Sequence, residues 1–148
     1  MNQFLIFTFL INFYSLNAQS RGVSIDTTIM TKEGDMPIEL LDMNHEIISY
    51  HNIFCLEKSR VKNVDITQMK IITIYTENKK IEVSEQQKMM TIHGWEYAKN
   101  LNINDSIITF QGSRLITGFF KNDTKHDVYS ITSEPHQTFF ANGFLLKK

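Results

Sequence analysis

The chain has 148 residues, which is enough for one compact domain with a hydrophobic core. Its 15 lysines and arginines nearly balance its 16 aspartates and glutamates, so the formal net charge is −1. That balance gives no electrostatic reason to expect nucleic acid or an anionic membrane as a partner. Aromatic residues make up 11% of the chain, a fraction that argues against a disordered polypeptide.

The N-terminal segment is uncharged and apolar. Residues 1–18, MNQFLIFTFLINFYSLNA, carry no charged side chain and contain one apolar block from Phe4 to Ile11. The block is shorter than the roughly 20 residues that cross a bilayer. This pattern predicts a signal peptide over residues 1–18, cleaved after Ala18, and a secreted or periplasmic mature chain without a transmembrane segment. The alternative is a buried N-terminal strand.

Strand signals dominate the rest of the chain. The β-branched and aromatic runs at 71–76, 81–84, 106–110 and 127–132 predict strands. Polar and glycine-containing stretches at 77–80, 111–113 and 121–123 predict turns between them. Only residues 95–101 suggest a helical turn. Short strands with frequent turns predict an all-β domain over residues 20–148.

The sequence repeats itself after sixty residues. Residues 23–50 align with residues 83–110 without a gap, and both copies place a glycine where the chain must turn. One copy alone would leave strand edges and an apolar face uncovered, so we expect two units related by a pseudo-twofold axis. The identical pairs are Val23/Val83, Ser24/Ser84, Met30/Met90, Thr31/Thr91, Gly34/Gly94, Leu41/Leu101, Asn44/Asn104, Ile47/Ile107 and Ile48/Ile108.

Three stretches carry a resemblance to a known family. Residues 31–50 fit the pattern T-x-x-G-x-x-x-I-E-x-L-x-x-G-D-x-V-x-S-Y. Residues 94–107 fit G-W-x-x-A-x-x-L-x-x-G-D-x-I, and residues 128–146 fit V-Y-D-L-x-V-x-x-x-H-N-F-F-A-N-G-I-L-V. In this order and spacing they resemble the Hint (Hedgehog/intein) family, including the bacterial intein-like domains. The resemblance implies a duplicated, horseshoe-shaped β-fold.

The resemblance also implies a chemistry, an acyl shift that breaks the peptide bond ahead of the domain. In the family a Cys or Ser at the first position attacks the preceding carbonyl, and a Thr-x-x-His motif polarises that peptide. A late Asp and a His assist proton transfer, and a terminal Asn cyclises. The matching positions hold other residues here: Gly22, Ser84 with Gln87, Ser130, Gln137, and Lys147 with Lys148.

These departures predict a catalytically inactive relative rather than an enzyme. The alternative is a relic autoprocessing domain in which Ser24 is the nucleophile, Ser84 polarises the peptide and His136 replaces the missing histidine. A one-residue slip in a strand turns a side chain to the opposite face, so we expect His136 to point away unless a bulge intervenes. After signal cleavage only residues 19–21 precede the domain, and we expect no cargo segment to be joined.

We therefore expect a binding scaffold that takes a protein or peptide partner along an exposed strand edge, with no cofactor and no metal. A decaying gene fragment without a selected role is a third possibility.

The single cysteine, Cys55, lies in an apolar run and is expected to be a buried core thiol. The five histidines show no ligand spacing, which predicts a scattered surface distribution.

Overall fold

The computed structural model describes residues 21–52 and 55–148, so the predicted signal peptide over 1–18 lies outside the described residues. Within the described part, the chain forms one 13-stranded sheet system and two short 3₁₀ helices. The first unit contains β1 (Val23–Ser24), β2 (Thr28–Thr31), β3 (Gly34–Pro37), η1 (Ile38–Leu40), β4 (Glu46–Asn52) and β5 (Cys55–Tyr75). The second contains β6 (Lys80–Ser84), β7 (Lys88–Thr91), β8 (Gly94–Tyr97), η2 (Ala98–Asn100), β9 (Ser106–Thr109), β10 (Gly112–Leu115) and β11 (Gly118–Glu134). A last hairpin contains β12 (Thr138–Ala141) and β13 (Phe144–Lys147).

The predicted duplication is confirmed residue by residue. Residues 23–49 and 83–109 have the same secondary structure at every position. Thr31 Oγ1 donates to the Gly34 carbonyl at 2.6 Å, and Thr91 Oγ1 donates to the Gly94 carbonyl at 2.8 Å. Both glycines have positive φ, 110° and 114°, a conformation that side chains with a Cβ rarely adopt. The shared Thr and Gly therefore close equivalent hairpins in the two units.

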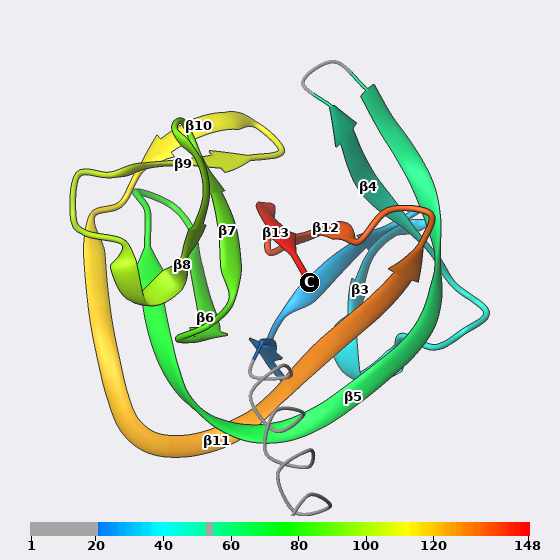
Figure 1. Ribbon diagram of the computed structural model, residues 1–148, viewed down its shortest axis with the longest axis horizontal. Coiled ribbons are helices and arrows are strands. Elements are labelled where there is room, and N and C mark those ends of the chain that lie inside the picture. Colours follow the sequence, from blue (N-terminus) through cyan, green and yellow to red (C-terminus); the bar gives the residue numbers. More distant parts are fainter. Residues whose placement is uncertain (1–20, 53–54) are drawn as a thin grey trace, which may run out of the picture.

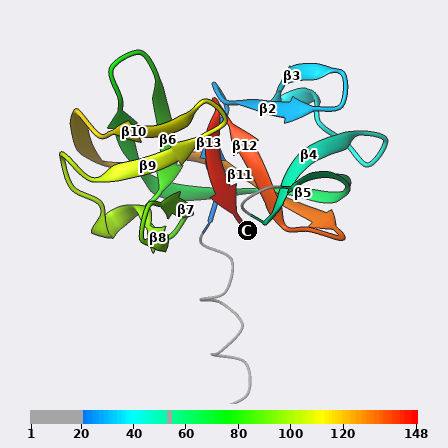
Figure 2. The ribbon, with the colours of Figure 1, turned by 90° about the horizontal axis from the view of Figure 1, so that it is seen from above.

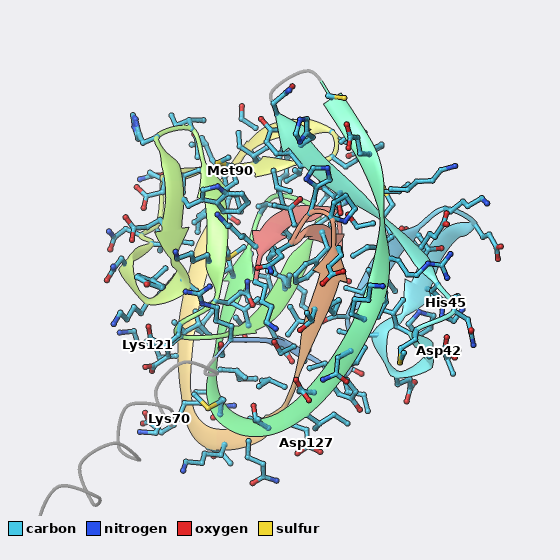
Figure 3. The ribbon with its side chains drawn as sticks, turned by 45° about the vertical axis from the view of Figure 1, so that its right-hand side comes forward. Asp42, His45, Lys70, Met90, Lys121 and Asp127 are labelled. Atoms are coloured by element: carbon cyan, nitrogen blue, oxygen red, sulfur yellow. The ribbon has the colours of Figure 1, made fainter. Side chains whose placement is uncertain are left out.

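Two long curved strands join the units into a horseshoe (Figure 1). β5 and β11 pair antiparallel from Gly118 opposite Tyr75 to Glu134 opposite Arg60, and they follow one another around the same bend. At that bend the side chains of Lys70, Lys121 and Asp127 point into solvent (Figure 3). The long pair therefore forms the back of the molecule and leaves the inner face to the core.

The β12–β13 hairpin lies between the two units (Figures 1 and 2). β12 contacts β2 of the first unit through Ala141 and Ile29, and β13 contacts β7 of the second through Leu146 and Met89. All five of its central apolar residues, Phe139, Phe140, Phe144, Leu145 and Leu146, are at most 3% exposed. The hairpin thus fills the space between the units and connects their cores.

Two local predictions need correction. Residues 121–123 do not form a turn between strands; they lie inside β11, where the register with β5 shifts between Asn122 and Lys125. A bulge accommodates polar residues at an exposed bend without ending the strand. The helical turn begins at Ala98 rather than Trp95, because β8 runs to Tyr97. No helix among the described residues has the length and apolar character needed to cross a membrane.

Candidate functional site

Both ends of the described chain meet at one turn, formed by residues 84–87. The backbone N–H of Ser84 donates to the Gly22 carbonyl at 2.9 Å. Gln87 Nε2 donates to the Lys147 carbonyl at 2.8 Å. Figure 1 places the C-terminus in the middle of the horseshoe, near the start of the coloured chain. The structure therefore brings together Gly22, Ser84, Gln87 and Lys147, four of the positions singled out from the sequence.

Gly22 occupies a position that is closed to side chains. A Cβ atom built on Gly22 would lie 2.9 Å from the Tyr129 carbonyl oxygen and 3.0 Å from Val128 Cβ. Both neighbours belong to β11, which pairs directly with β1 through Val23 and Tyr129. The first of these contacts is with backbone, so a side chain at position 22 requires a shift of β11. Position 22 therefore has no side-chain nucleophile, and a side chain there would displace the backbone of β11.

Gln87 is a buried structural amide. Its side chain is 1% exposed, and Nε2 donates to the Lys88 and Lys147 carbonyls at 3.0 and 2.8 Å. Its backbone N–H donates to the Ser84 carbonyl, and its carbonyl accepts from Ala98. An amide neither gains nor loses a proton near neutral pH. Gln87 therefore holds the C-terminal strand against the turn and supplies no acid or base.

Ser24 is the pseudo-twofold counterpart of Ser84. Its side chain is 5% exposed, and its Oγ lies 3.4 Å from Thr27 Oγ1, the residue equivalent to Gln87. The peptide that Ser24 would attack belongs to β1, which β11 and β6 flank on either side. The peptide ahead of Ser24 therefore lies within a paired strand, and the Ser24 hydroxyl is buried beside Thr27.

Of the other predicted positions, Ser130 lies beside Gly22, because β1 pairs antiparallel with β11 and Val23 stands opposite Tyr129. Ser130 is half-buried in β11, opposite Asp65 of β5. Gln137 is exposed, and its carbonyl accepts from the backbone N–H of Lys148 at 2.9 Å. Lys148 Nζ donates to Thr132 Oγ1. Through these two hydrogen bonds, Lys148 contacts β11 and the connection between β11 and β12.

A second group forms at the open end of the first unit, where His51, Glu57 and His136 meet. His136 Nε2 and Glu57 Oε2 are 2.7 Å apart, and the His51 and His136 ring centroids are 4.6 Å apart. The ring of His136 therefore faces Glu57 and His51. The prediction of scattered histidines is wrong for this pair, which comes together across 85 residues of sequence.

Cys55 borders this group and corrects a further prediction. It is half-buried at the start of β5, and its Sγ–H donates to Glu57 Oε1 at 3.9 Å. The expected core thiol is thus a partly accessible one. His51 and Glu57 come together because β4 pairs with β5, with Tyr50 opposite Leu56 and Asn52 opposite Cys55.

Cations surround the aromatic residues of β8. Lys147 Nζ lies 5.7 Å from the Trp95 ring centroid, and Trp95 is half-buried. Three further cations lie within cation–π distance of Tyr97: Arg21 at 5.9 Å, Lys88 at 5.6 Å and Lys99 at 5.6 Å.

Two carboxyl groups have perturbed acidities. The hydrogen bond from His136 lowers the pKa of Glu57, assisted by the nearby positive potential of His51 and opposed by partial desolvation. The pKa of Glu96 is lowered first by the side-chain amide of Asn100, at 3.1 Å, and then by the backbone N–H of Tyr97. Both carboxylates are therefore charged at neutral pH.

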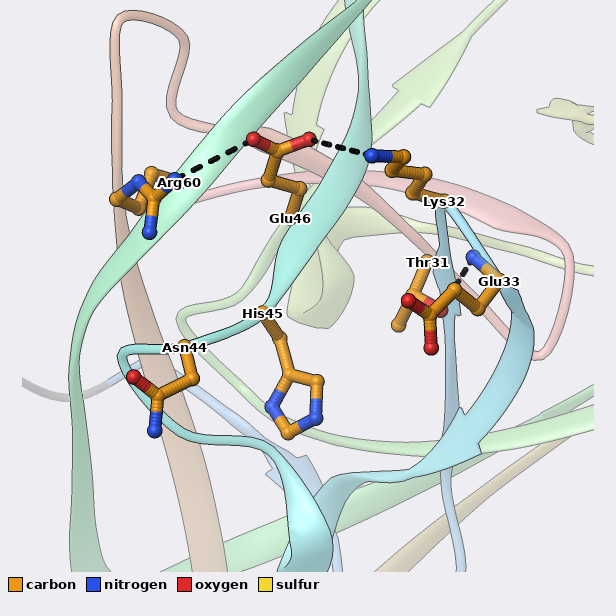
Figure 4. A pocket seen from close by; sticks show the side chains of 7 residues that line it. All are labelled: Thr31, Lys32, Glu33, Asn44, His45, Glu46 and Arg60. Carbon is orange, nitrogen blue, oxygen red and sulfur yellow. Dashed lines mark hydrogen bonds and ion pairs between the residues drawn. The ribbon is translucent and has the colours of Figure 1, made fainter.

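A polar pocket lies between the β2–β3 hairpin and β4 (Figure 4). Glu46 lies between two cations there, 3.9 Å from Lys32 Nζ and 3.4 Å from Arg60 Nη2. A second pocket lies at the equivalent place sixty residues later, between the β7–β8 hairpin and β9. Because both units repeat it, the pocket is a product of the duplicated hairpin rather than a specialised site.

Comparison with solved structures identifies the fold of this chain. No protein-family model matches the sequence, and no curated protein matches it. The Ssp DnaB mini-intein variant M86 has a TM-score of 0.79 at 20% identity, over 87% of this chain and 95% of that chain. A bacterial intein-like domain from Clostridium thermocellum has a TM-score of 0.79 at 16% identity, over 88% and 100%. For the gp41-1 intein the values are 0.75, 18%, 86% and 98%.

The fold of this chain matches these solved structures over almost their whole length, at identities that support the fold alone. The likeness confirms the fold that the three motif stretches predicted. This chain has the Hint fold of the inteins and bacterial intein-like domains.

Proposed function

We propose that this chain is an exported Hint-fold protein that neither splices nor cleaves itself and that acts as a binding scaffold. The observation that carries the proposal is the closed position at Gly22, where β11 backbone lies 2.9 Å from the place of a Cβ. An acyl shift needs a side-chain nucleophile beside the scissile carbonyl. Gly22 offers none.

The surroundings of Gly22 support the same conclusion. Gln87, at the position of the family's histidine, directs its amide hydrogens to two backbone carbonyls. Ser24, the alternative nucleophile, is buried in β1. His136, the alternative histidine, directs its ring to Glu57. We therefore expect that Ser24, Ser84 and His136 do not act as one catalytic group.

The scaffold half of the proposal rests on the sheet edges. Among the described strands, β10 pairs with β9 alone, and β3 pairs with β2 alone. At the β10 edge Leu115 and Phe110 are 54% and 49% exposed. An extended peptide can add a strand to such an edge and place apolar side chains against these two residues. Export rests on the signal-like pattern of residues 1–18.

A reporter domain fused ahead of Gly22 tests the catalytic half. We expect no reporter release in hydroxylamine or dithiothreitol, as followed by gel electrophoresis and intact mass. Gly22→Cys is also expected to release nothing and to lower the free energy of unfolding by about 1–3 kcal/mol, because its side chain overlaps β11. The loss of stability is measured by urea denaturation.

Ser24→Ala is the matched control in the reporter experiment. Its fusion is expected to stay uncleaved, at the mass calculated for the variant, and to show the same absence of release as the parent fusion. Reporter release by the parent that disappears in Ser24→Ala would support the relic autoprocessing domain and contradict the proposal. Efficient cleavage by Gly22→Cys would show that position 22 accepts a nucleophile, which would also contradict it.

Selection of peptides from a random displayed library tests the scaffold half. We expect extended, β-branched peptides that lose at least tenfold in affinity for Leu115→Lys, because the charge disrupts an apolar contact at the β10 edge. Leu40→Lys is the control, since Leu40 is 62% exposed on η1, away from that edge. Failure to select any peptide, or equal losses in both variants, would contradict edge binding.

A further inference from the structure

We propose that His51, Glu57 and His136 form a binding site for a divalent transition metal ion of the Zn²⁺ type. One ligand atom from each residue lies within 4.8 Å of the other two. The three residues come from β4, from β5 and from the connection between β11 and β12. Their meeting is therefore a product of the tertiary structure.

The donor set determines the class of metal. Two imidazole nitrogens and one carboxylate oxygen favour Zn²⁺, Co²⁺, Ni²⁺ and Cu²⁺ over Ca²⁺ and Mg²⁺, which prefer oxygen ligands. In a tetrahedral zinc site with bonds of about 2.1 Å, the ligand atoms lie about 3.4 Å apart. The three ligand atoms lie within 4.8 Å of one another, and His136 Nε2 and Glu57 Oε2 are 2.7 Å apart, so binding requires small side-chain rotations in which the metal replaces the His136–Glu57 hydrogen bond.

The backbone holds two of the ligands in place. His51 is the extra residue of a β-bulge, since Tyr50 pairs with Leu56 and Asn52 pairs with Cys55. A bulge changes the direction of a side chain relative to the regular strand. The backbone N–H of His136 donates to Ser59 Oγ at 3.2 Å, and its carbonyl accepts from Ser133 Oγ at 2.5 Å. Both serines are 1% exposed, so buried hydrogen bonds fix the position of the His136 backbone.

The group is open to solvent on one side. The His136 and Glu57 side chains are 19% and 43% exposed. His51 and His136 also line a surface pocket. Trp95, Gln137 and Lys147 are among its other lining residues. Three protein ligands leave a fourth position for water or for a group from a partner that enters this pocket. An exposed ion pair contributes little to stability, so the ligand variants should fold.

Titration of the full chain, prepared without a histidine tag, with ZnCl₂ and CoCl₂ tests the proposal. We expect one ion per chain by calorimetry, and Co²⁺ absorption bands typical of four-coordinate geometry. His51→Ala and His136→Gln are each expected to weaken binding at least tenfold, and the double variant to abolish it. Circular dichroism checks that each variant is folded.

His93→Ala and His126→Ala are the matched controls, because both histidines are exposed and outside the group. They are expected to bind Zn²⁺ as the parent does. Cys55→Ser removes the competing thiol and is expected to keep the affinity within about threefold. Absence of binding by the parent, equal losses in the controls, or binding that depends on Cys55 and survives the double variant would overturn the proposal.

Discussion

Replacement of Gln87 by glutamate is expected to lower the free energy of unfolding by about 3–5 kcal/mol at pH 7. The change is nearly isosteric, but it removes both N–H donors and aims a carboxylate at the Lys88 and Lys147 carbonyls. The position is 1% exposed, so water cannot replace the lost partners. Urea denaturation across a pH series measures the effect.

The same variant has a defined pH dependence. Burial and two facing carbonyls raise the pKa of the introduced carboxyl in the folded state above its unfolded value of about 4.3. Below about pH 4.3 both states are protonated, and the variant approaches the parent in stability. As the pH rises above the unfolded pKa, the unfolded state loses its proton first, and the variant loses stability relative to the parent.

Two controls separate charge from hydrogen bonding at this position. Gln87→Met removes the donors without adding a charge and is expected to lose about 1–3 kcal/mol independently of pH. Gln111→Glu places the same charge at an exposed turn and is expected to change stability by less than about 0.5 kcal/mol. Equal losses of stability in Gln87→Glu and Gln111→Glu would show that the buried hydrogen bond from Gln87 to the Lys147 carbonyl does not stabilise the fold.

Replacement of Phe144 by alanine is expected to lower the free energy of unfolding by about 3–5 kcal/mol. Phe144 is 0% exposed. It pairs with Ala141 of β12 and with Thr109 of β9, so it lies where the last hairpin meets the second unit. The lost ring leaves a cavity at the junction of the units, and thermal and urea denaturation both report it.

Phe120→Ala is the control for the loss of an aromatic ring. Phe120 is 62% exposed on β11 and makes one edge-to-face contact with Tyr75, at a centroid distance of 5.7 Å. Its replacement is expected to lose about 1 kcal/mol or less. Similar losses in the two variants would mean that the last hairpin does not connect the two cores.

The duplication was visible in the sequence because both units need the same residues at the same turns. The Thr–Gly pairs at 31/34 and 91/94 close equivalent hairpins, and their chemistry is local. The closing stretch 128–146 was likewise recognisable by its motif, although its place between the units was not. Local turn chemistry and apolar pattern therefore predicted the all-β fold.

The length of β11 was not predictable from local pattern. The polar residues 121–123 have the composition of a turn, yet the pairing of β11 with β5 continues past them through a bulge. An exposed bend in a long pair of strands tolerates the same polar residues as a loop. Composition alone cannot distinguish the two.

By itself, the sequence determined the repeated β unit and its turns, and it has glycine and glutamine at the two positions that the Hint resemblance aligns with a nucleophile and a histidine. Only the tertiary structure decided that β11 closes the space at Gly22, that Gln87 binds the C-terminal strand, and that His51 and His136 meet beside Glu57. The physical reason is the sequence distance over which each kind of interaction acts. Turn preference and strand pattern act between neighbours in sequence, whereas steric closure and side-chain clusters depend on strands that the fold brings together from distant parts of the chain.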